Sequence, residues 1–342
     1  MIIEYEYAQL VERREKLIFI DVRTPKEYEE EHIPGAVNIP VFSNEERERI
    51  GILYKNQGKK EATREALKIV GAKVYDMYTE FEKVLKKGKK LVVYCARGGM
   101  RSSTVTALFR ELSLPVLKLS KGYKGYRNYI NEKLPKMTEK VKFIVLYGKT
   151  GSGKTKILKE MKNMGYDVLD LEGCANHRGS LLGSIGLGIE YSQKYFESLV
   201  FESFFSFKTD TVFVEGESRR IGNIVIPIYL YEKILDSEKI YIETDIYKRI
   251  NIIKEEYLKE EYDKEEIIKA VQKLSRYTGE KQAEEFIESI KNDEFDTVIK
   301  DLIEKYYDRV YKTKNKIIEK VFYNENEKKC ASEIIKYFIG GE

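Results

Sequence analysis

The feature that most constrains the fold of this chain is a glycine-rich segment between an apolar run and a helical pattern. Residues 141–147 are mostly apolar and predict a buried strand. They precede a G-x-x-x-x-G-K-[ST] motif made of Gly148, Lys149, Thr150, Gly151, Ser152, Gly153, Lys154 and Thr155. In this context the backbone N–H groups of the loop would surround a phosphate group, Lys154 would add positive charge, and Thr155 could ligate a magnesium ion when one is bound. The motif does not specify the phosphate compound.

A second glycine-rich turn follows the apolar run 91–94 and begins with Cys95. The turn continues through Arg97, Gly98, Gly99, Arg101 and Ser102. A turn of this kind before a helix directs backbone N–H groups toward one point, so we expect Cys95 to form a thiolate more readily than an ordinary cysteine. Arg101 would hold an oxyanion with its forked guanidinium. A buried structural cysteine is the alternative, and the glycine and arginine spacing argues against it.

The order of predicted elements indicates an α/β protein with two largely parallel sheets. At 342 residues the chain is long enough for two domains, and we place them at 1–134 and 140–342. The segment between them is polar and contains Pro135. The second domain is a P-loop α/β domain extended by helices over 246–311, with a last strand at 317–323 and a last helix at 328–338.

Two further polar stretches follow predicted strands of the second domain. The candidate residues in them are Asn176, His177, Arg178, Glu215, Glu217, Arg219 and Arg220. Ligands bind at the carboxyl ends of parallel strands, so these residues should face the same crevice as the phosphate loop. Either Glu215 or Glu217 is placed to hold a metal-bound water. The alternative is that these acids pair structurally with the adjacent arginines.

The stretch 122–129 is the best candidate for RNA contact, because the formal net charge of +4 is too small to argue for nucleic acid by itself. Its Lys124, Tyr126 and Arg127 would bind phosphates and stack on unpaired bases. An equally weighted alternative is that its tyrosines pack beneath the cysteine turn.

Cysteine usage and hydropathy point to a cytoplasmic protein. The chain has only three cysteines, widely spaced, which fits neither a disulfide framework nor a zinc site. No apolar run approaches membrane-spanning length. We expect Cys174 to be structural, and we expect Cys330, within a late charged helix, to be incidental. The sequence does not indicate the oligomeric state.

The first third of the chain resembles the rhodanese family of sulfurtransferases. The resemblance rests on Asp21–Pro25 (DVRTP), His32–Pro40 (HIPGAVNIP) and the turn that begins at Cys95, in the family's order. It implies a rhodanese-like parallel-sheet domain with Cys95 in the active-site loop.

Taken with the phosphate loop, GCANHRGS at 173–180 and GESRRIG at 216–222, the whole chain resembles the tRNA 2-selenouridine synthase family. The resemblance implies a transferase that modifies the wobble uridine of tRNA. In that family 2-thiouridine is S-geranylated from geranyl diphosphate, and selenium from selenophosphate then replaces the geranylthio group. It further implies Cys95 as the catalytic cysteine, no tightly bound cofactor, and an enzyme that supplies selenophosphate as a partner. Whether Cys95 carries selenium or assists substitution on the nucleoside stays open.

Two other enzyme classes fit parts of the sequence. Residues 95–102 satisfy C-x-x-G-x-x-R-S, the phosphate-binding loop of cysteine phosphatases, some of which share the rhodanese fold. That interpretation leaves the second domain without a role. An ATP-dependent kinase with a regulatory rhodanese domain would use Lys154, Thr155 and Glu215.

Overall fold

A computed structural model describes residues 4–180, 182–258, 263–310 and 317–340 of the chain. The chain forms two compact units, which are 1–134 with 197–199, and 135–196 with 200–342. The segment 134–140, predicted as the domain boundary, is the helical end of α5 (Gly122–Lys140), with Pro135 inside the helix. No helix among the described residues has the length and apolar character needed to cross a membrane.

The first unit contains a five-stranded parallel sheet in the order β1-β5-β4-β2-β3. Its strands are β1 (Glu4–Tyr5), β2 (Leu17–Asp21), β3 (Val37–Asn38), β4 (Lys90–Tyr94) and β5 (Val116–Leu119). Its other elements are α1 (Tyr7–Leu10), the 3-10 helix Val11–Lys16, α2 (Pro25–Glu30), α3 (Asn44–Val84), α4 (Met100–Glu111) and the start of α5. The prediction of an α/β domain with a parallel sheet is confirmed here.

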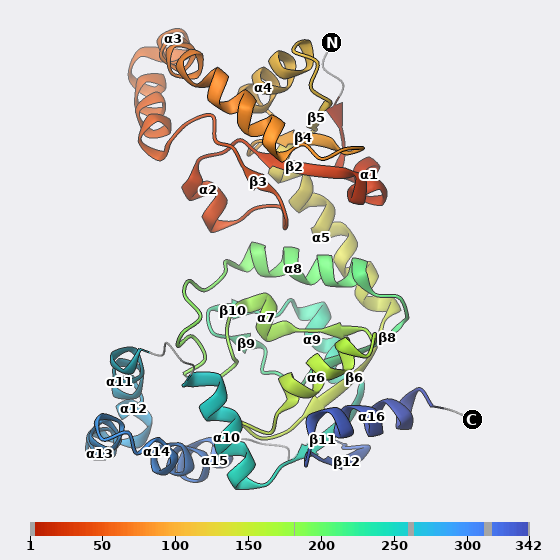
Figure 1. Ribbon diagram of the computed structural model, residues 1–342, viewed down its shortest axis with the longest axis vertical. Helices are drawn as coiled ribbons and strands as arrows, with labels where there is room; N and C mark the ends of the chain where they lie inside the picture. The colour runs from red at the N-terminus through yellow and green to blue at the C-terminus, as the bar shows by residue number, and fades with distance from the viewer. Residues whose placement is uncertain (1–3, 181, 259–262, 311–316, 341–342) are drawn as a thin grey trace. The chain divides into compact units, whose positions relative to one another are not determined.

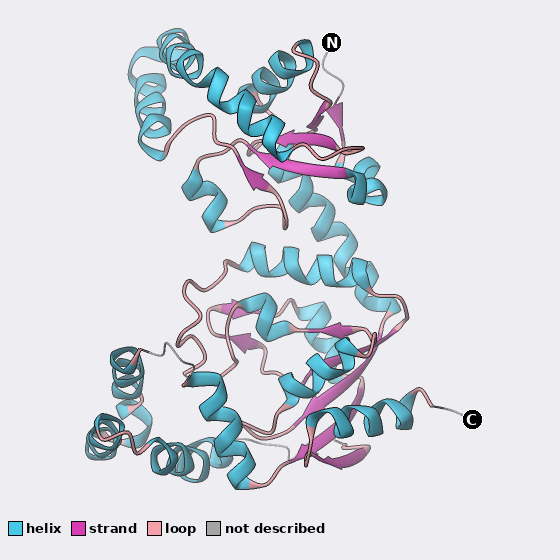
Figure 2. Cartoon of the chain, in the orientation of Figure 1, coloured by secondary structure: helices cyan, strands magenta, loops and turns pink. Residues whose placement is uncertain are grey.

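The helices of this unit cover both faces of its sheet (Figures 1 and 2). Phe81 of α3 and Phe109 of α4 pack edge to face beside Val93 of β4 in one core. On the other face, Tyr7 of α1 and Tyr126 of α5 contact each other edge to face. The central strand β4 is therefore buried on both sides, and this rigid strand delivers Cys95.

The second unit contains another five-stranded parallel sheet, in the order β12-β11-β6-β8-β7. Its strands are β6 (Lys142–Tyr147), β7 (Val168–Leu169), β8 (Thr211–Glu215), β11 (Glu238–Glu243) and β12 (Lys320–Tyr323), beside the hairpin of β9 (Arg220–Ile221) and β10 (Ile224–Val225). Alternate side chains of β6 point to opposite faces of the sheet. Ile144 packs with α6 (Lys154–Asn163) and α16 (Glu327–Phe338), whereas Phe143 packs against Phe204 of α8 (Gln193–Ser206).

The predicted helical extension is confirmed over its described part. It comprises α10 (Ile246–Tyr257), α11 (Lys264–Lys273), α12 (Ser275–Thr278), α13 (Glu280–Lys291), α14 (Phe295–Leu302), the π-helix Ile303–Tyr307 and α15 (Asp308–Val310). The remaining helices of the unit are α7 (Leu171–Ala175) and α9 (Ile228–Leu235). Helices α11, α13 and α14 enclose a core of their own, which includes Val271, Phe286 and Val298. The last strand and helix also lie where the sequence predicts them.

Candidate functional sites

The phosphate loop joins β6 to α6, as the motif predicts. Gly151 and Gly153 have φ values of 77° and 83°, which lie in the left-handed region that favours glycine. A Cβ at Gly148 would lie 2.8 Å from the carbonyl oxygen of Ile242, so the first glycine permits close packing against β11. The amino group of Lys154 donates to the carbonyl oxygen of Gly148 at 3.0 Å, across the mouth of the loop. The loop is therefore preformed for an anion.

Contacts from distant parts of the chain support this loop. Arg249 donates from Nε to the Thr150 carbonyl at 2.9 Å and forms a two-pronged ion pair with Asp308. Lys149 also binds Asp308, at 3.2 Å. Lys149 is therefore engaged by an acidic residue in this structure, and Lys154 is the lysine directed across the loop.

Three carboxylates gather beside Thr155 at the carboxyl ends of β7 and β8. The Thr155 hydroxyl donates to Glu172 and Glu215 at 3.3 Å each. Single oxygens of Glu172, Glu215 and Glu217 lie within 4.8 Å of one another. One oxygen of Glu215 is buried without a hydrogen-bond partner. Such an arrangement of hard oxygen ligands fits a divalent cation of the magnesium class.

Burial and mutual repulsion explain the electrostatics of this cluster. Burial raises the pKa of Glu215 above its ordinary value, and the negative charge of Glu217 raises it further. Burial likewise raises the pKa of Glu172, with Glu215 as the next cause. Without a cation the cluster therefore favours protonation, and a bound cation would reverse that preference.

The predicted crevice residues divide into two groups. Arg178, Glu215 and Glu217 line the same cleft as the phosphate loop, so their predicted convergence is confirmed. The acids cluster near Thr155, which differs from the alternative of structural pairing with the adjacent arginines. Arg219 and Arg220 are exposed and are not among the residues that line the cleft, which contradicts their placement in it.

Asn176 and His177 support the loop rather than face the cleft. The side-chain amide of Asn176 donates to the carbonyls of Leu187 and Ile189 at 2.8 and 2.9 Å. His177 is buried, and its ring lies where a side chain on Gly222 would be. Burial lowers the pKa of His177. The prediction that Asn176 and His177 face the crevice was therefore wrong in this structure, because the turn itself uses their polar groups.

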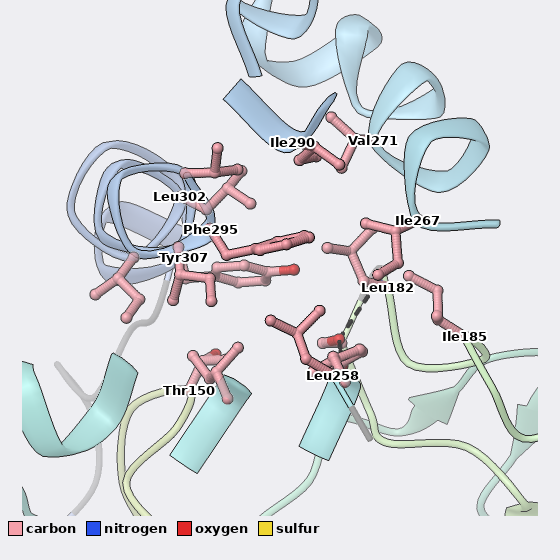
Figure 3. A pocket seen from close by; sticks show the side chains of 16 residues that line it. Thr150, Leu182, Ile185, Leu258, Ile267, Val271, Ile290, Phe295, Leu302 and Tyr307 are labelled. Atoms are coloured by element: carbon pink, nitrogen blue, oxygen red, sulfur yellow. Dashed lines mark hydrogen bonds between the residues drawn. The ribbon is translucent and has the colours of Figure 1, made fainter. Parts of the chain in front are cut away.

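An apolar pocket adjoins the phosphate cleft, and the sequence did not predict it (Figure 3). Thr150, Ser180, Ile253, Tyr257 and Tyr307 line both cavities. The pocket continues between α10, α11, α13 and α14, and its remaining walls are almost entirely hydrocarbon. These walls include Leu182, Ile267, Ile290, Phe295, Val298 and Leu302.

In the first unit, Cys95 directly follows β4 and is 3% exposed. Its sulfur lies 3.2 Å from the hydroxyl of Ser102, which is fully buried in α4. Gly99 is the N-cap of α4, and Gly98 has a φ of 67°. The predicted order of strand, cysteine turn and helix is confirmed.

The start of α5 packs directly against the cysteine turn. Tyr123 and Lys124 donate their backbone N–H groups to the carbonyls of Cys95 and Ala96 at 2.9 and 3.0 Å. A Cβ at Gly122 would lie 2.0 Å from the carbonyl oxygen of Cys95. This geometry supports the alternative given for the stretch 122–129, that it packs beneath the cysteine site.

Two of the three RNA-contact candidates in this stretch are buried. Tyr126 is 0% exposed in the core, so it cannot stack on a base in this structure. Arg127 is 8% exposed, donates to the Ser198 hydroxyl at 3.1 Å and forms an ion pair with Glu197. Only Lys124 is exposed. The prediction was wrong for Tyr126 and Arg127 because composition does not show which side of a helix faces the core.

Arg101 is held by an acidic residue that the sequence analysis did not select. Its guanidinium donates to both carboxylate oxygens of Glu27, at 2.6 and 3.1 Å. Burial opposes ionisation of Glu27, but these two hydrogen bonds bring its pKa below the ordinary value. Arg101 lies on the wall of the Cys95 groove, and an oxyanion there would compete with Glu27 for it.

The other two cysteines differ from Cys95. Cys174 and Cys330 are buried, and Cys330 belongs to the core of the second sheet. Burial raises the pKa of each thiol to about 12. Both side chains therefore favour the neutral thiol, which agrees with the structural role expected for Cys174.

Comparison with known proteins identifies related families for both parts of the chain. A family profile described as "tRNA 2-selenouridine synthase AAA domain" matches residues 141–338, and one described as "Rhodanese-like domain" matches 5–129. The tRNA 2-selenouridine synthase of Sulfurovum sp. is 34% identical over 258 residues, which cover 70% of this chain and 65% of that protein. The protein of the same name from Alcanivorax borkumensis is 30% identical over 268 residues, which cover 77% of this chain and 70% of that protein.

A solved structure is also similar to part of the chain. A rhodanese-related protein from Thermoplasma volcanium covers 38% of this chain and 91% of its own length, at 21% identity and a TM-score of 0.23.

Proposed function

The chain belongs to the tRNA 2-selenouridine synthase family, and from this membership we propose that it converts 2-thiouridine in tRNA to 2-selenouridine in two stages. In the first stage a geranyl group is transferred to the sulfur of the wobble base. In the second stage selenium replaces the geranylthio group. The matched region spans 65% of the Sulfurovum relative. We therefore assign the activity of the whole relative to this chain only as part of the proposal.

The observation that carries the proposal is the apolar pocket beside the phosphate loop. A nucleotide needs a phosphate cradle and polar contacts to a sugar and base, whereas the cavity next to this cradle is lined by side chains such as Phe295, Val298 and Leu302. The linings of the two adjoining cavities match the chemistry of a phosphate group joined to a hydrocarbon chain. Geranyl diphosphate has this structure, and we place its diphosphate in the loop and its chain in the pocket. The apolar pocket has a volume of about 60 Å³ in this structure, so it would have to widen to admit a geranyl chain.

In the first stage the sulfur of 2-thiouridine attacks the first carbon of the geranyl chain. A carbon–sulfur bond forms, the carbon–oxygen bond breaks, and the electron pair leaves with diphosphate. Lys154 and the N–H groups of the loop would stabilise the negative charge that develops on the leaving group. The residues that fit a cation there are Thr155, Glu172, Glu215 and Glu217, and a bound divalent cation would neutralise further diphosphate charge.

In the second stage we place the reaction at Cys95. Selenium of selenophosphate attacks carbon 2 of the base, a carbon–selenium bond forms, and geranylthiolate leaves with the electron pair of the broken carbon–sulfur bond. Water then attacks phosphorus, and the phosphorus–selenium bond breaks to release phosphate. For this step Cys95 would act as the neutral thiol, and not as the thiolate that its glycine-rich turn predicts. Its sulfur lies 3.2 Å from the Ser102 hydroxyl, and the thiol would give its proton to the departing geranylthiolate.

A selenium atom carried on Cys95 is the less favourable version of this stage. If the thiolate took selenium directly from selenophosphate, the electron pair of the broken bond would stay on phosphorus and release phosphite instead of phosphate. The carrier version would otherwise need a separate oxidant. Mass spectrometry of the protein exposed to selenophosphate without tRNA should find an unmodified Cys95 peptide, and a selenium adduct on that peptide would support the carrier version.

The proposal is tested by nucleoside analysis of tRNA incubated with the protein, geranyl diphosphate and selenophosphate. Omitting selenophosphate should give S-geranyl-2-thiouridine, and supplying both should give 2-selenouridine. Omitting geranyl diphosphate should leave 2-thiouridine unchanged. Formation of 2-selenouridine without geranyl diphosphate would exclude the two-stage route.

A further inference from the structure

The groove beside Cys95 has an apolar floor. It has a volume of about 840 Å³, and Cys95 is among the residues that line it. The buried side chains Phe42, Ala62 and Val105 form part of this floor. Leu67 and Met100 also line the groove and are 62% and 59% exposed. Exposed side chains of this size next to a reactive sulfur offer a surface for a hydrocarbon group.

The rim of the same groove is basic. Arg47, Lys55, Lys59 and Arg97 line it and are exposed. Throughout the described ranges, none of these four side chains is in an ion pair. The one acidic residue of the lining, Glu27, is bound by Arg101. The rim therefore keeps a net positive charge that no neighbouring carboxylate neutralises.

The bend in α3 distributes this charge along the groove. The helix bends at Gly58, whose φ of 83° interrupts the helical geometry. Lys55 precedes the bend, Lys59 follows it, and both line the groove. Separate positive charges along a groove suit a chain of phosphates better than one small anion.

We propose that this groove binds the RNA strand of the geranylated intermediate, with the isoprenoid chain on the apolar floor and the flanking phosphates along the basic rim. This inference rests on the proposed function, because that function supplies the alkylated base. An unmodified RNA would use the rim alone, and a free isoprenoid would use the floor alone. The geranylated strand uses both, and it presents carbon 2 of the base to Cys95.

The test measures the affinity of the full-length protein for two synthetic anticodon-loop RNAs, one with 2-thiouridine and one with S-geranyl-2-thiouridine, over a range of salt concentrations. The floor variant combines Leu67→Gln with Met100→Gln, and the rim variant combines Lys55→Gln with Lys59→Gln. The controls lie outside the groove. They are Leu112→Gln, at an exposed leucine, and Lys86→Gln with Lys87→Gln, at exposed lysines.

The floor variant should reduce the preference for geranylated RNA at least about threefold and leave the affinity for unmodified RNA unchanged. The rim variant should weaken the binding of both RNAs. It should also reduce the slope of log affinity against log salt by about 1.4, because it removes two phosphate contacts to a single strand. The controls should match the wild type.

Results that differ from these expectations would contradict either the groove assignment or the proposed function. Wild-type affinity, preference and salt slope in both groove variants would overturn the inference, as would equal effects in the controls. If the wild-type protein forms S-geranyl-2-thiouridine and 2-selenouridine while the groove variants behave as wild type, the proposed function stands and the groove assignment fails. If the wild-type protein forms neither nucleoside, the proposed function fails, and the effect of the rim variant on unmodified RNA still reports whether the groove binds RNA.

Discussion

Cys95 and Lys154 follow strands of two different sheets, so their roles can be tested one at a time. Cys95→Ala removes the proton donor of the second stage and leaves the phosphate loop intact. We expect this variant to accumulate S-geranyl-2-thiouridine, with 2-selenouridine formation reduced by about two orders of magnitude or more. Nucleoside analysis of the tRNA measures both products.

Cys174→Ala is the matched control for this variant. Cys174 is also buried, but burial raises the pKa of its thiol to about 12 and no glycine-rich turn surrounds it. The Cys174→Ala protein should carry out both reaction stages, and it should lose little stability. Equal loss of 2-selenouridine in the two variants would argue against a specific role for Cys95.

The carboxylate cluster predicts an unusual dependence of stability on pH. Burial first, and then Glu217, raises the pKa of Glu215 from the ordinary 4.5, so the folded state holds a proton that the unfolded state releases. Without a divalent cation, the free energy of unfolding should therefore fall as the pH rises above 4.5. Glu215→Gln should flatten this fall, and Mg²⁺ should restore stability at neutral pH in the wild type only. Denaturant titrations across the pH range measure these effects.

At the residue scale, the sequence predicted the functional residues that lie within short continuous motifs. Lys154, Thr155 and Cys95 lie within short motifs that specify their own local geometry. Glu27 and Glu172 were missed because the fold brings them to Arg101 and Thr155 from distant positions. A signal was available for Glu172, since it lies in α7 shortly after β7, and Glu215 ends the neighbouring strand β8.

At the scale of elements, the contact between α5 and the cysteine turn is the least tolerant of change. Gly122 has a φ of 54°, and a Cβ there would lie 2.0 Å from the Cys95 carbonyl oxygen. Gly122→Ala should therefore destabilise the first unit by about 2–4 kcal/mol and impair the selenium stage more than the geranyl stage. Thermal unfolding and nucleoside analysis measure the two effects.

Gly71→Ala is the control for this substitution. Gly71 lies in α3, and a Cβ there would have nothing within 4 Å. The alanine should raise stability by up to about 1 kcal/mol, because alanine favours helix more than glycine does. If the Gly122→Ala protein is as stable and active as the Gly71→Ala protein, α5 does not support the cysteine turn as described.

The strands and helices themselves were largely predictable, because apolar runs and cap residues are local signals. Thr24 caps α2, for example, and Pro25 begins it. The orientation of α5 was not predictable, because Lys124 and Arg127 are interleaved with three tyrosines in 122–129 and either side could have faced the core. The apolar pocket was also missed, since the dense charge of 246–311 concealed the inward faces of four helices.

At the scale of the whole molecule, the account assigns one chemical stage to each of the two units. The diphosphate site and apolar pocket belong to the second unit, and the Cys95 groove belongs to the first. The net charge of +4 did not predict RNA contact by itself, whereas the groove gathers basic residues that have no ion pair within the described part of the chain. The two stages should consequently be separable in one protein.

The most direct test supplies purified tRNA that already contains S-geranyl-2-thiouridine to the Lys154→Ala variant, with selenophosphate and without geranyl diphosphate. The account predicts that this variant forms 2-selenouridine at nearly the wild-type rate, although it cannot geranylate 2-thiouridine. Cys95→Ala should leave the same tRNA geranylated. If Lys154→Ala fails to convert geranylated tRNA while remaining folded, the phosphate loop serves the selenium stage as well, and the division of the two stages between the two units is wrong.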